Sequence, residues 1–525
     1  MAYGLAHTVS LRGAVGHLID VQADVSPGQV GLTIVGRVDS AVSEGRDRVR
    51  MAIINSGIEW PATKRMTVLF SPADLPKTGT HHDLALACSI LAANQYLPDA
   101  ELDDLLLIGE LALDGGVRAV AGALPMVLAA AQRGITRVML PETQVAEASL
   151  LPGIDVIGVR SLAQVVAMLR GEEVPWAPPV PQSSGGTLLS WRGEDRLDEV
   201  DMSDLIGLRE AKYAAEVAAA GGHHLGFSGP KGCGKTSLAE RIPSILPDLD
   251  PEVSVELTAL QSLAGLLDPA RGLTLRPPYS APHHDCSKPS LVGGGTGRVR
   301  PGLLSLTHGG VILLDEFPLF RTDVIDALRQ PLESGEVTVA RGDESVTLPA
   351  RSIVVMASNP CPCGNKGLAN GDCRCRSTEL RDYERRIRGP LLDRVDITVR
   401  LNPAMVADAA LAPLETSAEI RQRVEAARQR QSERYRGFDW RLNAHVPGVM
   451  LRKRWPLPYE AQREIDQAIM GSHLSRRGGV RVHRLAWTVA DLAEVDQPGL
   501  QEVQVALRLR RGDSLPEHAL SRRAG

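Results

Sequence analysis

Eight consecutive residues near the middle of the chain have the types and spacing of a phosphate-binding loop. The segment GPKGCGKT comprises Gly229, Pro230, Lys231, Gly232, Cys233, Gly234, Lys235 and Thr236. It follows a strand-like run, LGFS, and opens a helical run, which is the context that this motif requires. The glycines let backbone N–H groups turn toward phosphates, and the start of the helix adds a positive potential. Lys235 is expected to neutralise the β- and γ-phosphates of a nucleotide, and Thr236 to hold Mg²⁺.

Two acidic residues and one asparagine, each at the end of an apolar run, fit the same chemistry. The run VILLDE ends in Asp315 and Glu316, and IVVMAS leads to Asn359. Ligands of a parallel sheet bind at the carboxyl edge of its strands. Asp315 is therefore expected to coordinate Mg²⁺ through water, and Glu316 to polarise the attacking water. Asn359 is placed to hydrogen-bond the γ-phosphate or that water; the alternative is a polar residue that starts a turn before Pro360.

Arg394, in the segment GPLLDRVD, is a candidate arginine finger. A guanidinium supplied across a subunit boundary stabilises the charge on the transferring phosphoryl oxygens. This interpretation requires an oligomer, usually a ring. The alternative is an ion pair of Arg394 with Asp393 or Asp396.

Four of the seven cysteines fall in two C-x-C pairs, at Cys361, Cys363, Cys373 and Cys375. A reducing cytosol favours metal over disulfides for such a cluster. Four thiolates satisfy tetrahedral Zn²⁺, so a structural zinc site is the favoured interpretation. Because C-x-C is tighter than the common C-x2-C, one ligand is expected to be strained or replaced. Two alternative interpretations of the four cysteines remain open: free or redox-active thiols, and an iron–sulfur cluster.

The elements that must position these residues form several domains, since 525 residues exceed one ordinary domain. Helices are expected over residues 82–93 and 121–133, and buried parallel strands over 225–228, 311–315 and 353–358. The predicted division is an N-terminal α/β domain (1–172), a Pro/Gly/Ser linker (173–197), an ATPase core (198–410), a helical lid (411–511) and a flexible tail (512–525).

Charge and composition exclude several classes of protein. The net charge of −5 excludes a uniformly basic nucleic-acid coat protein, and the 3% of aromatic residues excludes base stacking as the main mode of binding. Residues 411–511 nevertheless hold 18 Lys and Arg against 12 Asp and Glu, an excess of 18 − 12 = +6. This excess fits either solvated helix faces or a basic surface that follows phosphates. There is no apolar stretch for a membrane span and no signal peptide, so a soluble, cytoplasmic protein is expected.

Over nearly its whole length, the chain resembles the ComM/YifB family of magnesium-chelatase-like AAA+ ATPases. Besides the phosphate loop, the resemblance rests on long segments in the same order: RDRVRMAIINSG (46–57), SPADLPKTGTHHDLALA (71–87), GELALDGGVRAVAGALP (109–125), APHHDCSKPSLVGGG (281–295), GGVILLDEFPLF (309–320), NPCPCG (359–364), GPLLDRVD (389–396) and TVADLAE (488–494).

The resemblance implies an α/β fold class with three parts: an N-terminal Lon-protease-like domain, an AAA+ P-loop core with a parallel sheet and a helix-2 insert, and a C-terminal helical lid. It implies ATP and Mg²⁺ as cofactors and a homo-oligomer, a hexameric ring, that acts on single-stranded or branched DNA in branch migration or a helicase-type reaction. Two alternatives stay open. One is a chelatase-like ATPase that remodels a protein or cofactor complex, and the other is a nucleotide-gated scaffold.

The resemblance also places a second-sensor arginine in the lid, at Arg477, with Arg481 and Arg484 nearby. The segment LSRRGGVRVHRLAWTVADL departs from the usual pattern, since Gly478 and Gly479 loosen the start of its helix and Trp487 stands where arginine is usual. The phosphate loop departs as well, with Lys231 in place of proline and Cys233 in place of a small residue. Neither departure removes a ligand, because this loop binds through its backbone.

A Lon-like fold raises the question of peptidase activity, which needs a nucleophilic serine and an activating lysine. By the resemblance, the serine position falls at His81 and the lysine position at Leu124. The domain is therefore expected to be non-proteolytic. His81 and His82 are then expected to be surface or hydrogen-bonded residues.

Two segments are candidates for DNA contact. Residues 332–349 are expected to form a hairpin with Arg341 at its tip, which in related rings points into the central pore; a solvated turn is the alternative. The glycine-rich residues 291–300 carry Arg298 and Arg300. A few arginines that track a backbone give salt-sensitive, sequence-tolerant binding.

Overall fold

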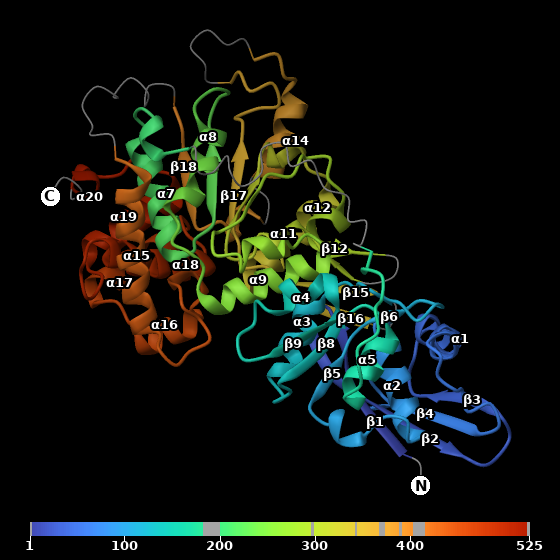
Figure 1. Ribbon diagram of the computed structural model, residues 1–525. Helices are drawn as coiled ribbons and strands as arrows, with labels where there is room; N and C mark the ends of the chain where they lie inside the picture. Colours follow the sequence, from blue (N-terminus) through green and yellow to red (C-terminus); the bar gives the residue numbers. More distant parts are fainter. Residues whose placement is uncertain are drawn as a thin grey trace. The chain divides into compact units, whose positions relative to one another are not determined.

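The computed structural model describes residues 3–181, 200–295, 299–341, 344–366, 373–387, 391–402 and 415–521, without the side chains of 341, 344 and 521. The chain divides into two compact units (Figure 1). The N-terminal unit comprises Met1–Leu189, Ser254–Thr274 and Val299–Pro301, and the C-terminal unit comprises Ser190–Val253, Leu275–Arg298 and Gly302–Gly525. Residues 254–274, which the sequence analysis assigns to the ATPase core, thus pack with the N-terminal unit. Among the described residues, no helix is long and apolar enough to cross a membrane.

A mixed sheet of seven strands forms the centre of the N-terminal unit, in the order β3-β4-β2-β1-β5-β8-β9. Strands β1 and β2 form a long antiparallel pair in this sheet. Along β2, buried residues such as Val21 and Ala23 alternate with partly exposed ones, as expected for a sheet with one covered face. The strands are β1 (Tyr3–Arg12), β2 (Val15–Ser26), β3 (Gly31–Val35), β4 (Arg65–Ser71), β5 (Leu105–Leu107), β8 (Arg137–Pro141) and β9 (Asp155–Val159), with a separate small pair, β6 (Glu110–Leu111) and β7 (Val117–Arg118).

Helix α2 (Asp83–Ala93) is buried along its whole length and packs on β1 and β2. Gly4 permits this approach, because a Cβ there would lie 2.3 Å from the carbonyl oxygen of Ser89. The other helices of the unit are α1 (Ser40–Asn55), η1 (Asp99–Glu101), α3 (Ala123–Ala131), η2 (Glu142–Gln144), α4 (Val145–Ala148), α5 (Leu162–Arg170), η5 (Pro269–Arg271) and, from Ser254 onward, α9 (Pro251–Ala264).

The residues at the expected peptidase positions are all buried. His81 and His82 are each 1% exposed, so neither lies at the surface. Nε2 of His81 lies 2.8 Å from the carbonyl oxygen of Val9, which fits the hydrogen-bonded alternative, and His82 packs edge-on against Phe70. Leu124 is fully buried in α3.

The C-terminal unit is built on a five-stranded parallel sheet with the order β11-β14-β17-β10-β18. β17 is central, and all six of its residues are buried, as expected for a strand covered on both faces. The strands are β10 (Leu225–Ser228), β11 (Tyr279–Ser280), β14 (Val311–Leu314), β17 (Ile353–Ser358) and β18 (Ile397–Arg400).

Short helices and one hairpin surround this sheet. The hairpin pairs β15 (Glu336–Arg341) with β16 (Glu344–Pro349) in antiparallel register. The helices are η3 (Met202–Asp204), α7 (Arg209–Gly221), α8 (Lys235–Arg241), η4 (Ile242–Ile245), α10 (Lys288–Val292), α11 (Leu303–Leu306), η6 (Phe317–Leu319), α12 (Thr322–Ala327), α13 (Pro331–Ser334), α14 (Ser377–Ile387) and η7 (Leu392–Arg394). The two-residue segments β12 (Gly293–Gly294) and, in the N-terminal unit, β13 (Arg300–Pro301) complete the strands.

The last hundred described residues are helical and lie on the α7 and β18 side of the sheet (Figure 1). They form α15 (Ser417–Arg434), η9 (Asn443–His445), α16 (Gly448–Arg454), α17 (Tyr459–Met470), α18 (Arg476–Leu492), α19 (Leu500–Arg511) and α20 (Glu517–Ser521). Several polar contacts fasten this helical lid to α7, and two of them come from arginines of α15. Arg423 pairs with the buried Glu216 at 2.8 Å, and Arg428 donates to the carbonyl oxygen of Ala219 at 2.7 Å.

Candidate functional site

The phosphate loop lies between β10 and α8, and its glycines are required by its geometry. Gly232 and Gly234 have φ values of 79° and 87°, in the left-handed region that side chains disfavour. A Cβ on Gly229 would lie 2.4 Å from the carbonyl oxygen of Leu401. The thiol of Cys233 is buried and donates to the carbonyl oxygen of Pro230 at 2.9 Å, so this departure from the usual motif is accommodated inside the loop.

Lys235 connects the loop with the neighbouring strand ends. Its ammonium group donates to the carbonyl oxygens of Gly229 and Pro230, both at 2.7 Å, and to Oδ1 of Asn359 at 3.1 Å. Nδ2 of Asn359 in turn donates to Oε1 of Glu316 at 3.1 Å. The structure therefore joins three residues that the sequence singled out, Lys235, Asn359 and Glu316, in one hydrogen-bonded chain.

Thr236 and Asp315 form the second contact of the site. The hydroxyl of Thr236 donates to Oδ2 of Asp315 at 2.9 Å, and the backbone N–H of Glu316 donates to Oδ1 of Asp315 at 2.8 Å. Adjacent hydroxyl and carboxylate oxygens are the ligands that Mg²⁺ takes beside phosphates, so these two residues fit the ion. Glu316 has a φ of 49°, and such strain in a residue other than glycine is typical of functional sites.

The sheet order explains this convergence. β14, β17 and β10 are parallel neighbours, so Asp315, Asn359 and the phosphate loop follow their strands at the same edge. Carboxyl edges of parallel strands are where α/β sheets bind ligands.

Tyr383 is a site residue that the sequence analysis missed. It is the buried residue of α14, its phenol is hydrogen-bonded to the backbone of Asn359, and the charge of Glu316 acts on it. Burial raises the pKa of Tyr383 to about 12, so it stays protonated at neutral pH. A single aromatic residue in a strongly charged helix is the only signal that the sequence offers for it.

Arg394 lies at the opposite edge of the sheet. It ends η7, directly before β18, whereas the phosphate loop follows the carboxyl end of the parallel strand β10. A four-residue strand is about 13 Å long, so Arg394 is far from the phosphate loop of its own chain. Nη2 of Arg394 pairs with Oε1 of Glu333 at 3.0 Å. The two carboxylates expected as alternative partners bond other residues: Asp393 bonds Arg510 and Asp396 bonds Arg481.

The three candidate sensor arginines of α18 have different surroundings. Arg477 is 74% exposed, and its Nη1 lies 3.5 Å from Oε1 of Glu333. Arg481 is mostly buried and pairs with Asp396 at 2.6 Å. Arg484 donates to the carbonyl oxygen of Val446, and burial lowers its pKa. Of the three, only Arg477 presents an exposed guanidinium, and it does so beside Arg394.

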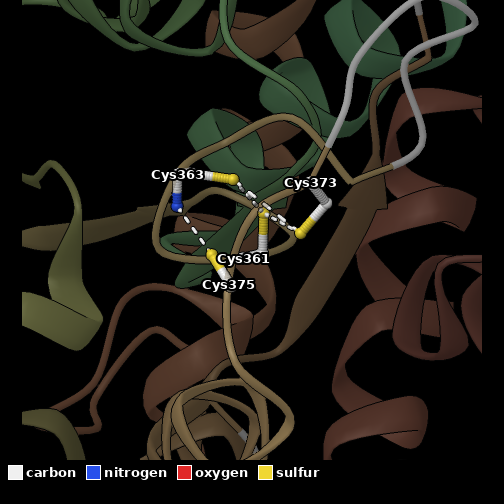
Figure 2. Close-up of side chains that lie close together, drawn as sticks. All are labelled: Cys361, Cys363, Cys373 and Cys375. Carbon is white, nitrogen blue, oxygen red and sulfur yellow. Dashed lines mark hydrogen bonds between the residues drawn. The ribbon is translucent and has the colours of Figure 1, made fainter.

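The four cysteines of the two C-x-C pairs lie together (Figure 2). They are free thiols, and their sulfurs all lie within 4.8 Å of one another. Figure 2 shows the sulfurs of Cys361, Cys363 and Cys373 facing one another, with Cys375 bonded to the backbone N–H of Cys363.

The structure describes the residues predicted for DNA contact only in part. Arg298 lies outside the described residues. Arg300 is exposed in β13, within the N-terminal unit. Arg341 is the last residue of β15, opposite Glu344 at the end of the hairpin, and its side chain is outside the description.

Known proteins resemble this chain over nearly its whole length. Three family models match successive parts of the chain: "Subunit ChlI of Mg-chelatase" over residues 21–144, "Magnesium chelatase, subunit ChlI" over 201–409 and "Magnesium chelatase, subunit ChlI C-terminal" over 414–510. An uncharacterized protein of Mycobacterium tuberculosis is 42% identical over 97% of this chain and 99% of its own. The YifB protein of Escherichia coli is 37% identical over 99% of both chains, and the competence protein ComM of Haemophilus influenzae is 35% identical over 96% of this chain and 97% of its own.

The chain therefore belongs to the ComM/YifB family of magnesium-chelatase-like AAA+ ATPases. Membership implies ATP hydrolysis, with ATP and Mg²⁺ as the cofactors. A shorter similarity, 25% identity over 183 residues, links the chain to Lon protease 2 of Bacillus subtilis. Together with the parallel sheet and the helical C-terminal region, these findings confirm the predicted α/β fold class with its Lon-protease-like, AAA+ and lid components.

Proposed function

We propose that this protein is an ATP-driven homo-oligomeric ring, a hexamer, that moves on single-stranded or branched DNA in a branch-migration or helicase-type reaction. The observation that carries the ring is the placement of Arg394, which lies at the sheet edge away from its own phosphate loop. An arginine in that place serves ATP hydrolysis only if a neighbouring subunit brings its nucleotide to it.

Within one subunit, each residue of the site has a distinct role. Gly229–Thr236 wraps the phosphates with backbone N–H groups, Lys235 neutralises them, and Thr236 with Asp315 holds Mg²⁺. Glu316 accepts a proton from the attacking water. Asn359, which bonds both Lys235 and Glu316, senses the γ-phosphate by exchanging one of these bonds for it.

Across the subunit boundary, Arg394 and Arg477 act together. Both guanidinium groups lie on Glu333, so a neighbour's triphosphate that reaches this carboxylate meets two positive charges at once. Arg477 is then the second sensor in trans. Its high exposure supports this role, since its guanidinium can reach a neighbour.

The DNA part of the proposal is supported by one relative's name, a competence protein, since competence is the uptake of DNA. It is also supported by the charges of the lid. Eight of the lid's 18 basic side chains form ion pairs with described acidic side chains: Arg421, Arg423, Arg430, Arg434, Arg441, Arg477, Arg481 and Arg510. Arg452, Lys453 and Arg454 do not: all three are exposed on α16, and none pairs with a described acidic side chain.

We call Arg452, Lys453 and Arg454 the α16 basic cluster. Neighbouring exposed residues, Val449 at 67% and Tyr459 at 80%, give it an apolar border. Three cations in succession, without a described acidic partner, fit a phosphate backbone and require no base sequence. We add this cluster to Arg298, Arg300 and Arg341 as the proposed DNA contacts.

The magnesium-chelatase descriptions of the matching family models favour a second candidate, an ATPase that remodels a protein or cofactor complex. The two candidates are separated by measuring the ATPase rate of the full-length protein without DNA, with single-stranded DNA and with a four-way junction. The motor predicts a several-fold rise with DNA and binding that weakens with salt. An unchanged rate, together with no binding at low salt, contradicts the motor and favours the remodeller.

A further inference from the structure

The sulfur positions of the cysteine cluster define a site for one metal ion. The separations are 3.3 Å between Cys361 and Cys363, 3.8 Å between Cys363 and Cys373, and 3.7 Å between Cys373 and Cys361. Four thiolates around Zn²⁺ at about 2.3 Å form a tetrahedron whose edges are about 3.8 Å long. The three measured edges are thus close to those of a zinc tetrahedron.

Backbone N–H groups donate hydrogen bonds to two of the sulfurs, which stabilises these cysteines as negatively charged thiolates. The N–H of Lys366 donates to Sγ of Cys361 at 3.3 Å, and the N–H of Cys363 donates to Sγ of Cys375 at 3.4 Å. Such bonds orient metal ligands and offset their charge. Four sulfur ligands select Zn²⁺ or an iron–sulfur cluster over Mg²⁺ or Ca²⁺. Because all the sulfurs lie within 4.8 Å of one another, the space between them suits one ion better than several irons with their sulfides.

The segment that carries these cysteines joins the ATP site at three points. It begins two residues after Asn359, at the end of β17. Gly364 lies against the phosphate loop, since a Cβ there would be 2.7 Å from Cγ and Cε of Lys231. Lys366 bonds Glu384 of α14 at 3.0 Å, next to Tyr383, which holds the backbone of Asn359.

We infer that Cys361, Cys363, Cys373 and Cys375 bind one structural Zn²⁺, and that this ion fixes Asn359, Lys231 and Tyr383 in the geometry that ATP hydrolysis needs. The second half of this inference rests on the proposed function. The four cysteines are metal ligands, and they act on the reaction only by positioning Asn359 and the phosphate loop.

The metal content of the full-length protein tests the site without any nucleotide. We expect about one zinc per chain by elemental analysis, with iron well below that. The variant Cys363→Ser/Cys373→Ser should lose the zinc. Cys286→Ser is the matched control and should keep it, because Cys286 is a half-buried thiol outside the cluster. Its neighbours His283, His284 and Asp285 form the other described group of potential metal ligands, so a loss of zinc in this control would assign the ion there.

Zinc below about 0.2 equivalents in the wild-type protein overturns the site, as does stoichiometric iron or a disulfide among the four cysteines. Substitution with Co²⁺ gives a second readout. Tetrahedral thiolate coordination produces visible absorption bands that the double variant should lack and the Cys286→Ser control should show.

The effect on the ATP site is tested by removing and restoring zinc in the wild-type protein. The loss of a group that orients the residues of a site from outside typically lowers activity by about tenfold or more. We expect kcat to fall by about that factor, fluorescent ATP analogues to bind with little change, and added Zn²⁺ to restore kcat. If zinc is present and its removal leaves kcat unchanged, the positioning role is wrong while the site stands. If the zinc-loaded protein hydrolyses no ATP, both the proposed function and the positioning role are wrong. The metal content then still shows whether the four cysteines bind zinc.

Discussion

Arg394 and Arg477 share one carboxylate oxygen: Oε1 of Glu333 lies 3.0 Å from Nη2 of Arg394 and 3.5 Å from Nη1 of Arg477. Arg394 belongs to the short helix before β18, and Arg477 to the start of the lid helix α18. Glu333 therefore holds Arg394 of the core and Arg477 of the lid side by side. In the proposed ring, a phosphate from a neighbouring subunit would replace this carboxylate, because both are oxyanions that guanidinium groups bind.

The first prediction concerns the trans action of Arg394. The variants Arg394→Ala and Lys235→Ala should each be inactive, because one lacks the finger and the other lacks phosphate binding. When they are mixed in equal amounts and reassembled, about a quarter of the interfaces combine an intact site with an intact finger. The ATPase rate of the mixture should then recover to about a quarter of the wild-type rate. A mixture as inactive as its components would show that Arg394 acts in its own chain or not at all.

The same mixing experiment applies to Arg477. Since Arg477 lies beside Arg394 on Glu333, Arg477→Ala should also be complemented by Lys235→Ala. Arg481→Ala should not be rescued in this way, because Arg481 is buried against Asp396 and its loss disturbs the fold of its own subunit. Thermal unfolding of Arg481→Ala checks that explanation, since its Tm should fall while that of Arg477→Ala stays near the wild-type value.

The second prediction separates binding from hydrolysis at the carboxylates. Glu316→Gln should keep ATP affinity and lose hydrolysis by about 100-fold or more, because the general base is gone. Asp315→Asn should weaken the Mg²⁺ dependence of binding, since Asp315 faces the Thr236 hydroxyl. Equilibrium binding of a fluorescent ATP analogue and a steady-state phosphate assay measure the two effects. The exposed Glu433→Gln on α15 is the matched control. Full hydrolysis by Glu316→Gln contradicts its assigned role.

The third prediction tests the α16 basic cluster. Arg452→Ala/Arg454→Ala should weaken DNA binding at low salt and reduce the slope of log K against log salt by about 2, one for each lost phosphate contact. Arg436→Ala/Arg463→Ala removes the same charge from lid positions outside the cluster and serves as the control. Fluorescence anisotropy with single-stranded and junction DNA gives both quantities. Equal effects of the two double variants would mean that only the total charge of the lid matters.

The fourth prediction concerns pH. Burial lowers the pKa of His224 to about 4. Nδ1 of His224 accepts the N–H of Val354 at 3.1 Å, which requires the unprotonated ring nitrogen. In the unfolded chain this histidine binds a proton below about pH 6.5, whereas in the folded chain it does so only below about pH 4.

The free energy of unfolding therefore falls as the pH drops from about 6.5 toward 4, and His224 contributes a loss of about 2 kcal/mol at pH 5. Denaturant unfolding of the wild-type protein at pH 7.5 and 5.0 measures this loss. His224→Gln should reduce the difference between the two pH values, while the exposed His473→Gln should leave it unchanged. An identical difference in the wild-type and His224→Gln proteins contradicts the assignment.

The sequence alone could predict the nucleotide site because its residues come directly after strand ends. Buried strands ending at Ser228, Leu314 and Ser358 are recognisable as apolar runs, and a parallel sheet brings the residues after its strands to one edge. Tyr383 and Glu333 could not be found in this way, because they reach their partners through packing between helices distant in sequence. The charges of the lid are a second example. The sequence gives the excess of basic over acidic residues, but only the fold reveals which arginines form ion pairs.

The division of the chain into units has a mechanical consequence. The backbone passes between the two units near residues 189, 253, 274, 298 and 301, and not only through the segment that the sequence indicates as a linker. In α9, the C-terminal residues pack with the N-terminal unit, where Ser262 bonds Glu147. A protease that cuts between residues 182 and 199 would thus leave the two halves tethered. Five crossings of the backbone, and not a single hinge, therefore connect the two units covalently.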